Sequence, residues 1–234
     1  SRFDFATDYG DLYQVFANTS HGFVLGYIWF LIGIILTSQG DVFWKSNKRN
    51  WKIHLVLGSL SYLYRLFNDD LPIIIKSHRA SDILKLIELK NTYDLNLIIM
   101  GAQEASLVAD EIVENNIPLI VNPINNIPNS FDELASNINM TPLLEKAGAT
   151  LMFNVSRSHN YHLTRQGAGV AVANGMSYGG AIKALTSNVA KTFNLNNRGS
   201  IKVGNMADIV VWEADPLEPS SMPEKVFING VDTD

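Results

Sequence analysis

The segment Leu71-Pro-Ile-Ile-Ile-Lys76 decides the interpretation of the fold, because a short apolar run is followed at once by a helical pattern. Apolar runs of this length are typical of strands that are buried on both faces of a parallel sheet. Residues 81–89, Ser-Asp-Ile-Leu-Lys-Leu-Ile-Glu-Leu, carry apolar side chains at helical spacing, with Ser81 at the position of an N-cap. Together the two patterns predict one β/α unit.

The alternation of strand and helix continues along the chain. We expect further strands at residues 95–100, 117–121 and 149–155, and helices at residues 104–115, 131–137, 141–147, 163–173 and 177–193. All four strands are expected to be parallel. A repeat of about 20 to 30 residues is typical of a parallel α/β barrel or of a doubly wound sheet. The fold class predicted from the residues alone is therefore α/β.

The tail has a different pattern, because glycines and β-branched residues replace the helical spacing. Residues 199–216 are Gly-Ser-Ile-Lys-Val-Gly-Asn-Met-Ala-Asp-Ile-Val-Val-Trp-Glu-Ala-Asp-Pro. They predict a short strand, a tight turn at Gly204 and a second strand at residues 208–212. A third strand, residues 224–230, ends in the turn-forming pair Asn229-Gly230. The tail is predicted to be a small antiparallel module.

Composition favours a globular protein and excludes some kinds of site. The chain has 234 residues, 47% of them hydrophobic, which is enough to bury the core of one large or two small domains. A net charge of −5, without a face rich in Lys and Arg, argues against nucleic acid as the main partner. The absence of cysteine excludes disulfides and thiolate metal ligands.

An apolar run precedes the predicted sheet. It begins at Gly22 and ends at Thr37, and it contains no Asp, Glu, Lys or Arg. Its length approaches the ~20 residues of a bilayer-spanning helix. A basic cluster at residues 45–52 follows, so the positive-inside rule places the rest of the chain in the cytoplasm if the run spans. The alternatives are a buried segment of a soluble protein and a misjoined foreign segment.

The middle and the tail together resemble the amidohydrolase (metal-dependent hydrolase) superfamily, in its imidazolonepropionase-like branch. The tail is similar to the family's closing pattern Gly-Ser-(Ile/Leu)-x-x-Gly-x-x-Ala-Asp-(Ile/Leu)-Val-(Val/Ile)-(Trp/Leu), which an Asp-Pro turn follows. The resemblance implies the last four β/α units of a (β/α)8 TIM-type barrel. It divides the chain into an N-terminal apolar segment (1–65), the C-terminal part of the barrel (66–195) and the β module (196–234).

Three stretches resemble the family's zinc site, and each departs from it. In residues 71–83, Lys76 stands where the family usually has a zinc-binding His, and His78 falls on a neighbouring pocket residue. Residues 100–110 resemble His-Gly-x-Glu-Ala-x-x-(Ile/Val)-Ala-Asp, with Gly101 at the second zinc-binding His. Residues 156–166 resemble a Thr-Asp-Ser-His-Asn run, with Arg157 in place of the metal-binding Asp.

These departures imply an eroded or incomplete metal site. Lys76 and Arg157 are cations that repel a divalent ion, and Gly101 offers no side chain. The family's His-x-His pair is absent from the sequence as well. Zinc is therefore expected to be absent or weakly held, and the weak candidate ligands are His78, His159 and His162. Two cations at one end of a barrel suit an anionic ligand instead.

Lys76 ends the first predicted strand, and the other candidate binding residues follow predicted strands. None is assigned a catalytic role: Lys76, His78, Glu104, Arg157, His159 and His162. For Glu104 the alternative is a place in the first turn of a helix, where the dipole favours it. One function that fits is a hydrolase of small molecules, acting on an amide or cyclic amide C–N bond. The other is a non-catalytic binding or scaffold relative, tethered to a membrane by its N-terminal run. A second copy of the chain is expected to cover the open strand edges.

Overall fold

The computed structural model describes residues 52–53, 55–60, 71–125, 127–155 and 161–233. The chain divides into two units, residues 1–64 and 65–234, and the described part of the first unit is helical and exposed. The predicted membrane run from Gly22 to Thr37 lies outside the described residues. In the part of the chain that is described, no helix combines the length and the apolar character that crossing a membrane requires. The membrane location and its soluble alternative both stay predictions.

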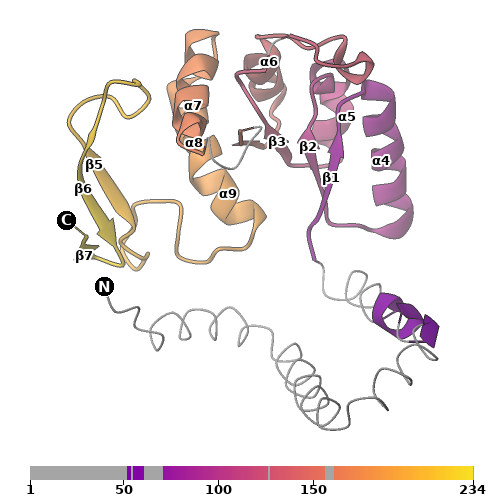
Figure 1. Cartoon of the computed structure of the whole chain (residues 1–234), viewed down its shortest axis with the longest axis horizontal. Helices are drawn as coiled ribbons and strands as arrows, with labels where there is room; N and C mark the ends of the chain where they lie inside the picture. The colour runs from indigo at the N-terminus through magenta and orange to yellow at the C-terminus, as the bar shows by residue number, and fades with distance from the viewer. Residues whose placement is uncertain (1–51, 54, 61–70, 126, 156–160, 234) are drawn as a thin grey trace, which may run out of the picture. The chain divides into compact units, whose positions relative to one another are not determined.

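Four parallel strands form the sheet of the second unit, which confirms the prediction from the apolar runs (Figure 1). The strands pair in chain order, so that Ile75 lies beside Ile99 and Leu119 beside Leu151. Their carboxyl ends therefore meet along one edge of the sheet. The arrangement is consistent with part of the predicted barrel. The strands are β1 (Ile73–Ser77), β2 (Leu97–Gly101), β3 (Leu119–Val121) and β4 (Leu151–Phe153).

The connections between the strands are helical, and their apolar side chains form the core with one face of the sheet. They are α4 (Ala80–Tyr93), the 3₁₀ turn η1 (Ala105–Val108), α5 (Ala109–Glu114) and α6 (Met140–Ala147). Ile83 of α4, Ile112 of α5 and Leu144 of α6 are each 0% exposed. Full burial of one such aliphatic side chain contributes about 1.5–3 kcal/mol, so these contacts fix the helices against the strands.

Two predicted helices differ from the structure. Residues 131–137 were predicted to be helical, but only a single 3₁₀ turn, η2 (Phe131–Glu133), forms. The predicted helix at residues 177–193 is two helices, α8 (Tyr178–Leu185) and α9 (Ser187–Thr192). They are separated by Thr186, whose hydroxyl donates to the carbonyl oxygen of Ile182 at 2.7 Å. Such a bond competes with the helical backbone bonds and bends the chain. α7 (Leu163–Ala173) has the predicted bounds.

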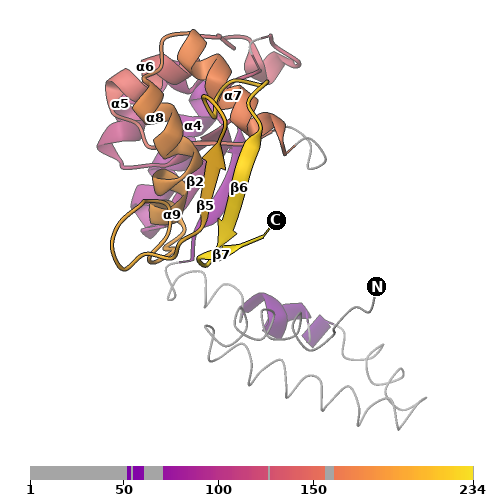
Figure 2. The ribbon, with the colours of Figure 1, turned by 90° about the vertical axis from the view of Figure 1, so that its left-hand side faces the viewer.

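The tail forms a three-stranded antiparallel sheet, in which β5 and β6 lie side by side (Figure 2). Its strands are β5 (Ile209–Trp212), β6 (Pro223–Ile228) and β7 (Val231–Asp232). Asn229 and Gly230 form the predicted turn, with φ values of 54° and 80°. The prediction of a strand before Gly204 is wrong, because the structure forms no strand there. Ile201, an apolar residue of that segment, is 86% exposed. Gly204 itself makes the predicted turn, with a φ of 90°.

Asp208 explains the Ala-Asp pair of the tail. Its carboxylate forms an ion pair with Arg198 and accepts a hydrogen bond from the backbone N–H of Asn229 at 2.8 Å. Beside it, the N–H of Gly230 donates to the carbonyl oxygen of Ala207 at 2.9 Å. One carboxylate thus ties the start of the tail to its last hairpin.

Arg165 of α7 holds the turn that follows β5. Its guanidinium donates to the carbonyl oxygens of Pro216 and Glu218, both at 2.6 Å, and to that of Pro219 at 3.4 Å. The same group lies over the ring of Trp212, 4.6 Å from the ring centroid. A planar, charged fork is well suited to several carbonyl oxygens at once. Arg165 therefore connects the β module to the helices.

Tyr178 makes a second connection, from α8 to the Asp-Pro turn. Its hydroxyl donates to Oδ1 of Asp215 at 2.9 Å, and the same oxygen accepts the N–H of Leu217 at 2.8 Å. Burial, the hydrogen bond and the charge of Asp215 together raise the pKa of Tyr178 above its usual value. The raised pKa is in the direction expected for a phenol that donates a hydrogen bond to a carboxylate.

Candidate functional site

Polar side chains follow the first three strands at the edge where their carboxyl ends meet. His78 comes directly after β1, Gln103 and Glu104 follow β2, and Asn122 follows β3. Backbone hydrogen bonds join the first two ends, from Ala102 to Ser77 at 2.7 Å and from Glu104 to His78 at 3.0 Å. Ligands of parallel β/α sheets bind at this edge. We therefore take it as the candidate site.

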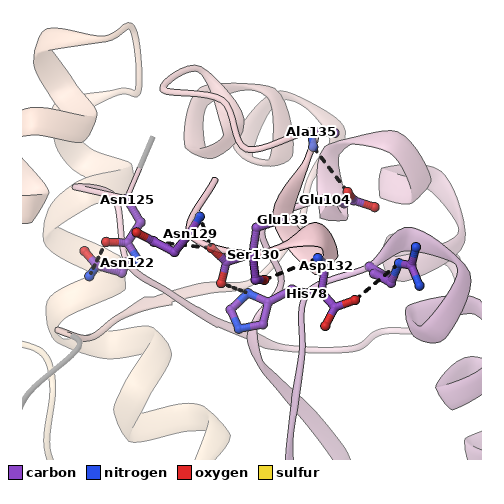
Figure 3. Close-up of polar contacts among 10 residues, drawn as sticks. His78, Glu104, Asn122, Asn125, Asn129, Ser130, Asp132, Glu133 and Ala135 are labelled. Atoms are coloured by element: carbon purple, nitrogen blue, oxygen red, sulfur yellow. Dashed lines mark hydrogen bonds and ion pairs between the residues drawn. The ribbon is translucent and has the colours of Figure 1, made fainter. Parts of the chain in front are cut away.

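The segment between β3 and α6, residues 122–139, folds back over this edge and contacts both β1 and β2 ends (Figure 3). Residue 126 within it lies outside the description. Its contacts bring an acidic turn, η2, against the start of α4. Two of these contacts are ion pairs, of Asp132 with Arg79 (3.5 Å) and of Glu133 with His78 (3.3 Å). The third is a hydrogen bond from the N–H of Ala135 to the carboxylate of Glu104 (3.2 Å).

His78 lies between Gly101 and Glu133. A methyl group added at Gly101 would lie 2.7 Å from Cε1 of the His78 ring, so the imidazole occupies the space beside that backbone. Glu133 is 8% exposed, and its Oε2 accepts hydrogen bonds from both nitrogens of Asn129, at 3.0 Å and 3.3 Å. Its Oε1 is left to face Nδ1 of His78 at 3.3 Å. This contact is close enough for an ion pair but is not aligned as a hydrogen bond, and Nδ1 has no other partner in the described chain.

Glu104 has both carboxylate oxygens bound to backbone N–H groups. Oε2 accepts from Ala80, the first residue of α4, at 3.0 Å, and Oε1 accepts from Ala135 at 3.2 Å. The first turn of a helix has free N–H groups and a positive dipole end, which a carboxylate stabilises. Glu104 therefore joins the start of α4 to the segment 122–139.

The other predicted site residues are placed as follows. Lys76 is exposed on β1, two positions before His78. His162 is exposed at the start of α7, with its ring edge-on to Tyr161. It lines a cavity of about 520 Å³ whose lining includes neither His78 nor Glu104. Arg157 and His159 lie outside the described residues. The structure thus brings His78 and Glu104 to one edge and places His162 elsewhere.

Sequence reasoning missed Glu133 and Gln103. Gln103 is 1% exposed, and its Oε1 has no hydrogen-bond partner within the described ranges. The sequence Ser130-Phe-Asp-Glu133 has the spacing of a helix capping box, and Ser130 Oγ does accept the N–H of Asp132 at 3.2 Å. That signal points to the start of a helix. It gives no indication that Glu133 turns toward His78.

The described residues do not fit a zinc ion at this edge. Lys76 is a cation, Gly101 has no side chain, and both oxygens of Glu104 are occupied by N–H groups. Zinc requires several neutral imidazoles or carboxylates that converge on one point. Among the residues that the structure describes, no three His, Cys, Asp or Glu side chains gather closely enough to hold a metal ion.

A parallel β/α sheet with its polar edge at the strand ends, together with a small antiparallel module, is a fold of the metal-dependent hydrolase class. The sequence matches the amidohydrolase family over residues 76–231, and the chain belongs to this family. The family is typically metal-dependent.

Individual relatives agree with this assignment over part of their length. Amidohydrolase tasK from Hapsidospora irregularis is 42% identical over 57 residues, which are 24% of this chain and 6% of that protein. An amidohydrolase from Thermotoga maritima MSB8 has a TM-score of 0.70 at 25% identity, over 86% of this chain and 55% of that one. A prolidase solved with N-methylphosphonate-L-proline shares the fold at 17% identity, with a TM-score of 0.52, over 68% of this chain and 44% of that one. The chain spans about half of the Thermotoga protein and a small part of the Hapsidospora one.

Proposed function

We propose that this chain is part of a hydrolase that acts on the C–N bond of an amide or cyclic amide, and that its strand ends bind the substrate rather than a metal ion. The observation that supports the proposal is the polar edge itself, which lies within the residues that match the family. His78, whose Nδ1 faces the buried Glu133 and makes no hydrogen bond within the described residues, is the group there that we assign to the substrate. Glu104 serves as a structural support, since both of its oxygens bind backbone N–H groups.

Lys76 supplies the charge that a small acidic substrate requires. An ammonium group carries three hydrogen-bond donors and attracts a carboxylate or the oxygen of a polarised carbonyl. Lys76 is exposed on β1. Arg157, which follows β4 in the sequence, is the second cation of this proposal. The ligand is thus expected to be a small amide with a carboxylate.

Hydrolysis can be tested with a panel of small amides. The panel contains N-acyl amino acids, cyclic amides and a dipeptide that ends in proline, the last because a prolidase shares the fold. We expect amine release by the purified chain. The assay is run with the chain alone and with the rest of the barrel supplied as a separate chain. His78→Asn should lower the rate by at least about tenfold, since one hydrogen bond to a reacting group contributes on this order. Equal rates in the wild type and in His78→Asn would contradict the proposal.

Metal content is a separate prediction. After dialysis the purified chain should retain less than one zinc equivalent, because Lys76 and Gly101 stand at two of the family's ligand positions. Elemental analysis measures this directly. Lys76→His alone should not raise the zinc content, because the other positions stay unsuitable. Stoichiometric zinc that a chelator removes would show that residues outside the described ranges, such as His159, complete a site.

A second function is favoured by the same two residues. A cation at position 76 and a glycine at position 101 suit a non-catalytic relative that binds an anionic small molecule without turnover. Binding without amine release, weakened by Lys76→Met and kept by Lys76→Arg, would favour this alternative. In either case a further copy of the chain, or the rest of the barrel, is proposed to cover the free edges of β1 and β4, because each pairs on one side only among the described strands.

A further inference from the structure

We infer that His78 and Glu133 form a fixed imidazole–carboxylate pair, in which Nδ1 carries the proton and Nε2 offers its lone pair to an N–H group of the ligand. The inference deepens the proposed function, because it names the residue that recognises the amide N–H. No metal ion takes part in it. Glu133 acts as a positioning residue, and His78 is the group that touches the ligand.

The environment of Glu133 explains why the carboxylate is directed at His78. Its Oε2 is fixed by the backbone N–H and the side-chain amide of Asn129, at 3.0 Å and 3.3 Å. The remaining oxygen, Oε1, lies 3.3 Å from Nδ1 of His78. A buried carboxylate oxygen is an acceptor, and a proton on Nδ1 is favoured there by the nearby charge, although the two groups are not aligned as a hydrogen bond. Two bonds at one oxygen of Glu133 thus set the proton position on the histidine.

The ring of His78 is held from its other side by Gly101. A methyl group at Gly101 would lie 2.7 Å from Cε1 and 3.0 Å from Nε2, so the ring rests directly against the glycine backbone. The side chain of His78 is 16% exposed, while Nδ1 is buried. Nε2, unlike Nδ1, is not among the fully buried side-chain atoms that lack a partner. Figure 3 shows this nitrogen pointing away from the segment 122–139.

The chemical class of the ligand follows from the tautomer. In the usual tautomer of histidine in water, Nε2 carries the proton and would donate to a carbonyl. A carboxylate at Nδ1 reverses this, so that Nε2 becomes an acceptor, as it does in histidines that are oriented by a second residue. An acceptor at His78, two positions after the cation Lys76, suits a molecule that has an N–H donor near an acidic or carbonyl oxygen. Secondary amides and lactams have both groups.

Nitrogen NMR of the full chain, labelled with ¹⁵N-histidine, tests the pair without an activity assay. We expect His78, identified by its loss in His78→Asn, to show a protonated Nδ1 and an unprotonated Nε2 at neutral pH. In Glu133→Gln the side chain keeps its shape and can still contact Asn129, but it presents an N–H to Nδ1. The tautomer of His78 should then reverse. His162 serves as the internal control, because it is exposed and its tautomer should not change.

The same spectra test the ligand class with two small probes. 2-Pyrrolidinone has an N–H donor, and N-methyl-2-pyrrolidinone has the same ring without it. We expect the Nε2 resonance of His78 to move with the first probe and not with the second. A proton on Nε2 in the wild type, or no reversal in Glu133→Gln, would overturn the pair. An equal response to both probes, or none to either, would overturn the ligand class. Failure of the hydrolysis panel with the expected tautomer would instead count against the proposed function alone.

Discussion

Gly101→Ala is expected to lower the free energy of unfolding by about 2–5 kcal/mol. Gly101 has a φ of 93°, a region in which an L-residue costs about 1–2 kcal/mol. The added methyl group would also lie 2.7 Å from the His78 ring. Overpacking of this kind typically costs a further 1–3 kcal/mol, roughly. Denaturant unfolding of the wild type and the variant measures the sum.

Two control variants separate the backbone cost from the clash. Gly204 has a φ of 90° and no heavy atom within 4 Å of an added methyl group, so Gly204→Ala should show the backbone cost alone, about 1–2 kcal/mol. When His78→Ala is combined with Gly101→Ala, the clash is removed, and the added cost of the Gly101 change should fall to the level of Gly204→Ala. An unchanged cost in the double variant would show that the His78 ring does not rest against Gly101.

Arg165→Met is expected to destabilise the β module by about 2–3 kcal/mol. The substitution removes the donors to three carbonyl oxygens and the cation over Trp212, but it keeps a long apolar side chain. Hydrogen bonds to a charged group contribute about 1.5–3 kcal/mol, and a cation–π contact about 0.5–1 kcal/mol when exposed. Because part of the Arg165 guanidinium is in contact with water, the expected loss of stability is smaller than the total of these individual values. Amide hydrogen exchange in β5 and β6 locates the loss.

Two variants set the scale for this result. Arg165→Lys keeps the charge but loses the planar fork, so it should recover only a part of the stability. Lys225→Met breaks an exposed ion pair with Asp232 in the same module and should cost about 0–1 kcal/mol. If Arg165→Met had no more effect than Lys225→Met, the connection between α7 and the module would not depend on Arg165.

The strands could be predicted from the sequence because each is a short, continuous apolar run. The helices of this fold show helical spacing of apolar residues instead. Leu97 to Ile99, for example, are 2% exposed or less. The helix at residues 177–193 could not be predicted correctly, since its apolar spacing continues across the break at Thr186. The strand before Gly204 failed for the opposite reason. Its apolar residues have the alternation of a strand, but Ile201 and Val203 are exposed and pair with no described strand.

The site was only partly predictable. The order of the strands brings His78 and Glu104 to one edge, and the sequence places each of them after a strand, with Lys76 near the end of β1. The partner of His78 could not be found in this way. Glu133 lies in a different β/α connection and reaches His78 only because Asn129 and Ser130 shape a single 3₁₀ turn. A local pattern describes the turn, whereas the contact depends on how the segment folds back over the sheet.

The role of Asp208 has a consequence for how members of this family are recognised in genome sequences. Its carboxylate closes the tail by binding Arg198 and the N–H of Asn229. The signature that includes Asp208 therefore reports that a hairpin has formed, and it carries no information about chemistry at the strand ends. This chain keeps the signature, while Lys76 and Gly101 stand where the resemblance to the family implies zinc-binding histidines. Catalytic competence should accordingly be assigned from those positions, and the tail should be used to assign ancestry alone.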